Sequence, residues 1–370
     1  MIAHTPLDPA TLSAAAQKAL GPGPGRMMAS RGMMPLPPAD QLAVLYQLSI
    51  DGDAGLAEAA RKTAAGLPEK LLAGSLSDGT LDARVLDFFG TMHADKPAIF
   101  DVVVQNHAIA DETIAALAAK ADSRAVDMIA TNEQRLLRHP EIIAAMYMNR
   151  RARMSTIDRI VELAVRNEVR VPGIAAWDEV ARALVGGTTG GNDDAAFAAV
   201  AEVVSGDDSK LTTGDAEQVL PEEELNAPVP IDELDQKSIR SLSVPSKIRL
   251  AQLGNAFARA ELIRDPLKLV ALAAIKSPGV TDIEAARYAG NQVLPEDVIR
   301  YISQKREWTR LYGIKMSLCR NPKTPISEAT KFLPFLREKD LTLLSKSKGV
   351  PSALVAQCRK LLMQRGGGKR

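Results

Sequence analysis

The residues with the clearest chemical potential lie in a run of basic and aromatic side chains between residues 300 and 323. Basic side chains can bind phosphates or carboxylates, and aromatic rings can stack on nucleic-acid bases. Trp308, Tyr312 and Lys315 also follow the i, i+4, i+7 spacing of one helix face, which is typical of core aromatics beneath a basic surface. The run therefore allows a packed helix with solvated charges, which is the default, an acidic protein partner, or a nucleic acid. Its basic members are Arg300, Lys305, Arg306, Arg310, Lys315, Arg320 and Lys323, and Tyr301, Trp308 and Tyr312 are interleaved with them.

A second basic cluster lies in the first half of the chain, where Arg150, Arg151 and Arg153 precede a helix expected to begin near Ser155. Arginine forks match the geometry of carboxylates and phosphates. These three side chains could therefore bind an acidic peptide or a phosphate, although solvation on a helix surface is equally plausible. We include them with the basic members of the 300–323 run and Trp308 as candidate partner-binding residues.

Catalytic and metal-binding patterns are missing from the sequence. The chain has 4 His and 2 Cys, and neither type shows the spacing of a nucleophile with its base or of a metal site. The run Gly21-Pro-Gly-Pro-Gly25 lacks the Gly-Lys-Ser/Thr ending of a phosphate-binding loop. We therefore expect no enzyme activity, no cofactor and no metal. A cleft with several buried, converging carboxylates would overturn that expectation.

The elements that position these residues are predicted to be helices. Aromatic residues make up only 4% of the chain and hydrophobic residues 46%, with Ala and Leu abundant, which favours close helix packing over sheets. Apolar residues at helical spacing recur in segments of about 12 to 20 residues that Gly, Pro and Asp punctuate. Asp53, for example, is expected to cap a helix that runs to Gly66. No apolar run approaches the length needed to span a membrane, and no secretory signal is evident, so we expect a cytoplasmic protein.

A weak self-similarity recurs in both halves of the chain, each copy having a turn residue, a short gap and a helix start. Asn or Ser at the head of a copy suits the turn that ends the preceding helix. Thr281 and Glu284 have capping-box spacing, and Thr324 is expected to cap a helix that begins at Pro325. The copies begin at Asn106, Asn149, Ser277 and Asn321, with a degenerate fifth copy at Lys348.

These copies resemble the α-solenoid repeats of the leucine-rich-repeat-variant or HEAT type. The Asn-Pro-x-Thr-Pro at 321–325 is similar to the turn of a leucine-rich-repeat variant. The copy spacings of about 43 residues are closer to those of HEAT repeats. The resemblance covers residues 106–167 and 277–362. It implies stacked antiparallel helix pairs and an extended groove of the kind that commonly binds partners.

Charge divides the chain more sharply than its net charge of +1 suggests. Residues 177–236 hold 15 Asp and Glu against 2 basic residues, whereas residues 246–370 hold 24 Lys and Arg against 10 acidic residues. Segregation on this scale indicates that the two segments contact each other or a charged partner. We expect an intramolecular contact in which the acidic segment from Asp207 to Asp235 folds over the basic C-terminal domain and competes with an acidic partner.

The predicted fold is all-α, with two stacks of antiparallel helix pairs joined by an acidic flexible linker. The predicted function is a non-catalytic scaffold or adaptor that binds an acidic protein partner through helical-repeat surfaces. The alternative is a helical-repeat protein that binds nucleic acid through the basic C-terminal face. The predicted segments are a flexible Gly/Pro/Met-rich arm (1–36), an N-terminal repeat domain (37–186), the acidic linker (187–239), a basic C-terminal repeat domain (240–365) and a disordered tail (366–370).

Overall fold

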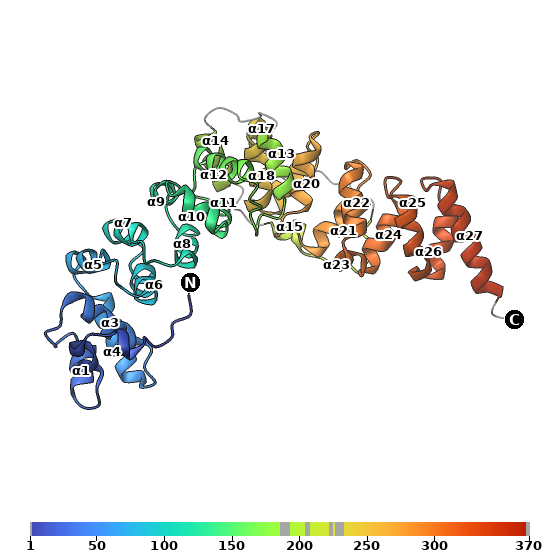
Figure 1. Ribbon diagram of the computed structural model, residues 1–370. Coiled ribbons are helices and arrows are strands. Elements are labelled where there is room, and N and C mark those ends of the chain that lie inside the picture. Colours follow the sequence, from blue (N-terminus) through green and yellow to red (C-terminus); the bar gives the residue numbers. More distant parts are fainter. Residues whose placement is uncertain (1, 186–192, 204–207, 222–224, 226–232, 368–370) are drawn as a thin grey trace. The chain divides into compact units, whose positions relative to one another are not determined.

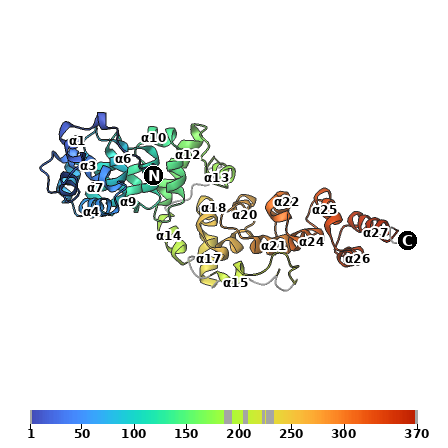
Figure 2. The same cartoon turned by 90° about the horizontal axis from the view of Figure 1, so that it is seen from below.

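The computed structural model describes residues 2–185, 193–203, 208–221, 225 and 233–367, and every regular element in those ranges is a helix (Figures 1 and 2). The predicted all-α class is therefore confirmed. The chain divides into two compact units, Met1–Gly173 and Ile174–Arg370.

The first unit is built from short helices that begin at capping side chains or prolines. Asp53, Asp82 and Asp122 each accept backbone N–H bonds at the start of α4, α6 and α9, and the cap predicted at Asp53 is confirmed. Helix α3 packs on α4, α5 on α7, and α8 on α11. The elements are η1 (Pro9–Thr11), α1 (Ala14–Leu20), α2 (Gly25–Ser30), α3 (Pro38–Ser49), α4 (Ala54–Ala65), α5 (Glu69–Leu76), α6 (Ala83–Met92), α7 (Pro97–Gln105), α8 (Asp111–Ala118), α9 (Ser123–Ile129), α10 (Glu133–Arg138), α11 (Glu141–Tyr147) and α12 (Met154–Arg166).

The second unit follows the same pattern of short packed helices, with α18 on α20, α21 on α24, and α26 on α27. The capping box predicted at Thr281 and Glu284 is confirmed at the start of α21. The elements are α13 (Trp177–Val185), α14 (Asp194–Val203), α15 (Ser209–Thr212), α17 (Glu233–Ser241), α18 (Val244–Leu253), α19 (Ala256–Leu262), α20 (Lys268–Ile275), α21 (Asp282–Gly290), α22 (Glu296–Gln304), α23 (Arg306–Thr309), α24 (Tyr312–Arg320), α25 (Ile326–Phe332), η2 (Leu333–Phe335), α26 (Glu338–Lys346) and α27 (Ser352–Gly367).

The cap predicted at Thr324 is wrong. Helix α25 begins at Ile326 with Pro325 as its N-cap, and the proline side chain accepts no hydrogen bond from the helix N–H groups. Thr324 is turned inward, where its hydroxyl oxygen is buried and has no hydrogen-bond partner among the described residues. The helix starts one residue later than expected, so that Pro325 is the N-cap and not the first helical residue. Thr324 therefore precedes the N-cap and is out of reach of the first helical N–H groups.

A buried asparagine links successive parts of each unit. Asn106, Asn149 and Asn321 are only 2–5% exposed. Each Nδ2 donates to two backbone carbonyls that lie 28–32 residues earlier, at 2.8–3.1 Å. Each Oδ1 accepts from the N–H two residues further on, at 2.8–3.0 Å. In the three copies that begin with asparagine, this head residue is therefore a clasp that holds its own turn against the end of an earlier helix.

A second link follows the asparagine by seven residues in the first unit. Thr113 Oγ1 donates to Asp87 Oδ1 at 2.5 Å, and Thr156 Oγ1 donates to Asp127 in the same way. Asp87 is fully buried. A buried carboxylate needs such partners because its desolvation would otherwise be costly. The two links recur together and give the first unit a regular internal repeat.

Residues 1–36 differ from the expected flexible arm. Helix α1 packs on α3, α2 packs on α3 and α4, and Ala16 and Ala19 are fully buried. His4 Nε2 also lies 2.7 Å from the buried Asp87 Oδ2. Ser13 caps an alanine-rich segment that is a good helix former, and the Gly/Pro run at 21–25 is the turn between two packed helices.

The boundary between the units also differs from the one expected after residue 186. Helix α13 packs on α18 and α20 of the second unit. Its Glu179 is 1% exposed and accepts from Lys276 Nζ at 2.9 and 3.0 Å. A buried carboxylate paired in this way commits α13 to the second unit, and the division therefore falls between Gly173 and Ile174.

The described parts of the predicted acidic linker are also packed. Helix α14 contacts α17 and α18, and α15 contacts α19 and α21. Gly366 and Gly367 of the predicted tail lie within α27. The rest of these two predicted segments, 187–192, 204–207, 222–224, 226–232 and 368–370, lies outside the described residues.

Candidate functional site

The aromatic members of the 300–323 run are largely packed against the second unit. Trp308 is 2% exposed, its ring lies edge-on to that of Tyr301 at 6.1 Å, and Lys305 Nζ lies 3.9 Å from the Trp308 ring centroid. Burial raises the pKa of Tyr301 and Tyr312, so both hydroxyls are neutral at pH 7. Because the Trp308 ring is enclosed, it offers no face on which a base could stack.

The basic members of the run divide into engaged and exposed side chains. Arg300 pairs with Glu296 at 2.6 Å, and Lys315 Nζ donates to the Arg310 carbonyl at 2.9 Å. Lys323 Nζ donates to two carbonyls, of Val293 and Leu294. The guanidinium groups of the three remaining arginines have no hydrogen-bond or ion-pair partner within the described part of the chain. They are Arg306 and Arg310, which are exposed, and Arg320, which is half-buried.

The arginine turn at 150–153 contributes one residue to a groove. Arg150, Arg151 and Arg153 are all exposed. Arg153 pairs with Asp127 at 3.0 Å, whereas the guanidinium of Arg151 has no partner among the described residues and lines a pocket of about 610 Å³. Three arginines that are grouped in the sequence therefore have different surroundings in the structure, and only Arg151 lines the groove.

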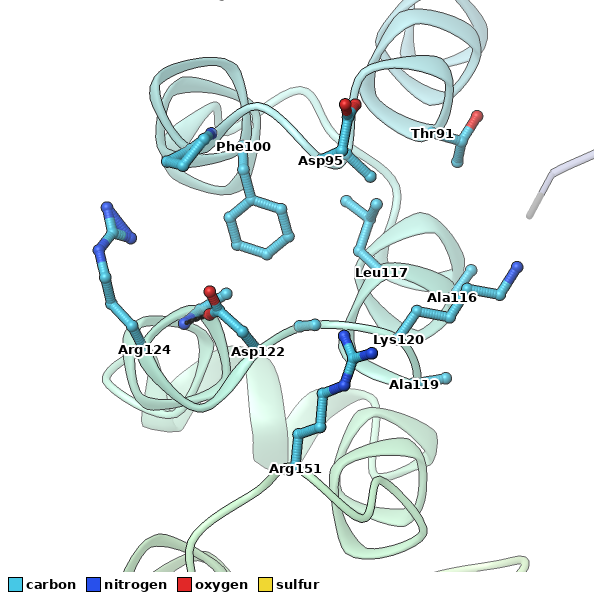
Figure 3. A pocket seen from close by; sticks show the side chains of 14 residues that line it. Thr91, Asp95, Phe100, Ala116, Leu117, Ala119, Lys120, Asp122, Arg124 and Arg151 are labelled. Atoms are coloured by element: carbon cyan, nitrogen blue, oxygen red, sulfur yellow. Dashed lines mark hydrogen bonds between the residues drawn. The ribbon is translucent and has the colours of Figure 1, made fainter.

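The floor of this groove is apolar (Figure 3). Phe100 of α7 and Leu117 of α8 point into the hollow, and each is no more than 5% exposed. Ala121 and Ala125 complete the floor next to them. The small alanines leave a concave apolar surface that would favour an aliphatic or aromatic side chain from a ligand.

The rim of the groove carries charge of both signs. Arg124 is engaged by Asp101, with Nη1 to Oδ1 at 2.9 Å, and Asp122 caps α9 by accepting from the Ala125 N–H at 2.8 Å. Arg151 reaches toward Phe100 and Leu117 from the loop before α12, while Asp95 lies at the opposite edge (Figure 3). Lys120 lines the edge beside Arg151, and its ammonium has no partner among the described residues. The Arg151 edge is therefore the positive end of the groove.

Asn149 positions this positive end. Its Nδ2 donates to the carbonyls of Ala118 and Ala121, both at 2.8 Å, and its Oδ1 accepts from the Arg151 N–H at 2.9 Å. One buried side chain thus joins the end of α8, which forms a wall of the groove, to the turn that carries Arg151. The repeat asparagine fixes the distance between apolar floor and cation.

Sequence reasoning found Arg151 but missed Phe100, Leu117 and Lys120. Phe100 and Leu117 have the spacing and type of ordinary core residues, and only the hollow beside them distinguishes them. Lys120 ends the copy that starts at Asn106, so its place next to a later arginine turn could be recognised only from the clasp of Asn149. The described residues contain no group of three or more His, Cys, Asp or Glu side chains that could hold a metal ion.

Comparisons with protein-family models, with curated proteins and with solved structures find no match to this chain. Within the described residues, no helix is both long enough and apolar enough to cross a membrane.

Proposed function

We propose that this protein is a non-catalytic scaffold or adaptor whose units are α-solenoids of the HEAT-like kind. We further propose that the groove of the first unit binds a short partner segment with an apolar side chain beside acidic residues. The observation that carries the proposal is the apolar floor of Phe100 and Leu117 next to the unpartnered cations of Lys120 and Arg151.

The solenoid part of the proposal rests on the recurring asparagine clasp. The same three hydrogen bonds occur at Asn106 and Asn149 in the first unit and at Asn321 in the second. Each clasp joins segments about 30 residues apart, which is the scale of one repeat contacting its neighbour. Architectures of this kind present extended surfaces for binding.

The expected free energies of binding assign different roles to the floor and the rim of the groove. Burying a leucine- or phenylalanine-sized side chain is worth about 1.5–3 kcal/mol, whereas an exposed ion pair contributes about 0.2–1 kcal/mol. The apolar anchor would therefore supply most of the affinity. Because Arg151 and Asp95 lie at opposite edges, the charges would set the direction of the peptide, with its acidic residue beside Arg151.

The test is selection of a displayed random peptide library on the full-length protein, followed by affinity measurement for the selected peptides. We expect a consensus of one large apolar residue flanked by Asp or Glu. Arg151→Glu should weaken these peptides about tenfold, because it replaces an attractive pair by a repulsive one. Ala116→Phe should abolish binding by filling the hollow, since Ala116 lines it.

Arg150→Glu is the matched control, because it makes the same charge change one residue away at an exposed position that does not line the groove. It should leave the affinity within about twofold of wild type. A selected consensus that is basic, or an equal loss in both arginine variants, would refute the groove as the binding site.

Nucleic-acid binding by the second unit is the alternative. Its support is the exposed pair Arg306 and Arg310, whereas the enclosed ring of Trp308 weakens it. Binding of single-stranded RNA by the full chain, with a steep dependence on salt that Arg306→Ala and Arg310→Ala reduce, would favour this alternative.

A further inference from the structure

Residues 208–221, together with Leu225, form a strap on the second unit. Its four-residue helix α15, at the lower edge of this unit in Figure 1, contacts α19 and α21, and residues 213–221 have no regular secondary structure. Further along, Asn291 Nδ2 donates to the Leu225 carbonyl at 3.2 Å. The strap therefore contacts the second unit at α19, at α21 and at the start of α24.

Carboxylates of the strap bind backbone N–H groups where helices begin. Asp208 Oδ2 accepts from the Ala256 N–H at 2.7 Å, and Glu217 Oε2 accepts from the Tyr312 N–H at 2.8 Å. The N-cap residue of α24, Leu311, has no side chain that could satisfy this N–H. Glu217 thus supplies from outside the anionic cap that α24 lacks in its own sequence.

Glycines of the second unit lie close to the strap. A Cβ on Gly313 would lie 2.1 Å from the Gln218 carbonyl oxygen and 2.5 Å from that of Ala216. A Cβ on Gly290 would lie 2.5 Å from Leu225 Cδ1. At Gly313 the close atoms are strap backbone carbonyls, which leave no space for a side chain, whereas Gly290 faces only the movable end of the Leu225 side chain. Gly313 is therefore the position that fits a chain passing over it.

The strap is bound by polar contacts more than by apolar burial. Ala216 is the only buried residue between 208 and 221, whereas most residues of the neighbouring α19 are buried. Segments with few buried apolar contacts open at low free-energy cost while the core stays folded. The basic residues of 246–370 outnumber its acidic residues by 14, so an acidic chain is attracted to this unit whether or not it belongs to the same molecule.

We propose that the strap is a built-in occupant of a peptide-binding face, and that the external ligand is an extended acidic segment of a partner protein that replaces it. The ligand would place a carboxylate on the Tyr312 N–H and pass its backbone over Gly313, as the strap does. The strap and the ligand exclude each other. The apparent affinity for the ligand is therefore the affinity of the open face multiplied by the fraction of molecules in which the face is open.

The experiment measures binding of a fluorescent synthetic peptide of residues 208–221 to the full-length protein by anisotropy. The double variant Asp208→Asn, Glu217→Gln loosens the strap and leaves the face unchanged. It should bind the peptide at least about tenfold more tightly than wild type, since two charge-assisted hydrogen bonds are weakened. Asp215→Asn is the matched control, because Asp215 bonds only to Glu217 and Gln218 within the strap, and it should bind like wild type.

Gly313→Ala separates release of the strap from opening of the site. Its new methyl group should displace the strap and also block the peptide, so hydrogen exchange at 208–221 should rise in this variant and in the double variant alike, while only the double variant gains peptide binding. Equal peptide affinity in wild type and double variant, or no binding although exchange shows a released strap, would overturn the proposal.

This proposal is independent of the groove in the first unit, because the two sites share no residue. Arg151→Glu should leave binding of the 208–221 peptide unchanged. A loss of groove binding with an intact strap response, or the reverse, would therefore identify which of the two proposals fails.

Discussion

At the scale of single residues, Asn149 connects the stability of the first unit to the geometry of its groove. The side chain is 5% exposed and its amide makes three hydrogen bonds, two to carbonyls at the end of α8 and one from the Arg151 N–H. A buried carbonyl that loses its donor keeps the cost of its desolvation. Removal of the clasp should therefore lower the free energy of unfolding by more than the number of its hydrogen bonds alone suggests.

We predict that Asn149→Ala lowers the free energy of unfolding of the first unit by about 3 kcal/mol, because it leaves backbone groups buried without partners. Urea denaturation followed by circular dichroism measures the change. Asn167→Ala is the control, since Asn167 is exposed and donates only to the Leu163 carbonyl, and it should change stability by less than about 0.5 kcal/mol. Similar losses in the two variants would show that the clasp has no special weight.

The role of such residues was only partly predictable. A turn asparagine can be inferred from local spacing, and Asn106, Asn149 and Asn321 were identified in this way. Their bonding partners lie 28–32 residues earlier, and nothing in a local pattern specifies which carbonyls these are. Arg151 was likewise found as part of a basic turn, but the hollow beside Phe100 arises from packing between helices and leaves no mark on the sequence.

At the scale of elements, α13 is assigned to the second unit by a buried ion pair as well as by apolar packing. Glu179 is 1% exposed and pairs with Lys276, whose ammonium also lies 5.9 Å from the Tyr301 ring centroid. Arg182 is a more distant second cation, 3.8 Å away. Removing one partner of such a pair leaves a buried charge, whereas replacing both partners by apolar residues removes that cost.

We predict that Lys276→Met destabilises the second unit by about 2–3 kcal/mol, somewhat less than for a fully buried pair because the ammonium is partly exposed. The double variant Glu179→Leu, Lys276→Met should recover most of that loss. Thermal unfolding of the three proteins, with the wild type as reference, measures both effects. A double variant less stable than Lys276→Met alone would show that Glu179 has other partners that matter more.

Helix propensity and punctuation predicted most elements, including those capped at Asp53 and Thr281. They failed where tertiary packing decided the outcome. The glycines and prolines of residues 21–25 suggested a free arm, yet α1 and α2 on either side bury alanines against α3 and α4. The N-terminal domain was expected to end at residue 186, although the burial of Glu179 and Trp177 places α13 in the second unit.

At the scale of the whole molecule, the charge division predicted a contact but not its chemistry. The described parts of the acidic segment pack within the second unit, and the hydrogen bonds of Asp193, Asp208 and Glu217 go to backbone N–H and hydroxyl groups near helix starts. Net charge brings the two segments together over distance. The directional bonds then come from helix ends, whose positions no charge count reveals.

The division into two units predicts where the chain can be cut. Trp177, Val180 and Leu184 of α13 are buried, so a fragment 187–370 would expose the surfaces of α18 and α20 that α13 covers. Burial of each such side chain stabilises the fold by about 1.5–3 kcal/mol. We therefore predict that fragment 187–370 unfolds at least about 10 °C below fragment 174–370, given about 2–4 °C per kcal/mol for a domain of this size.

The complementary pair gives the sharper comparison. Fragment 1–186 carries α13 without the helices it packs on, so it should be no more stable than fragment 1–173 and should expose extra apolar surface, seen as increased binding of a hydrophobic dye. Differential scanning calorimetry of all four fragments distinguishes the two boundaries. If 1–186 were the more stable N-terminal fragment and 187–370 matched 174–370, α13 would belong to the first unit, and the Glu179–Lys276 pair would not be what positions it.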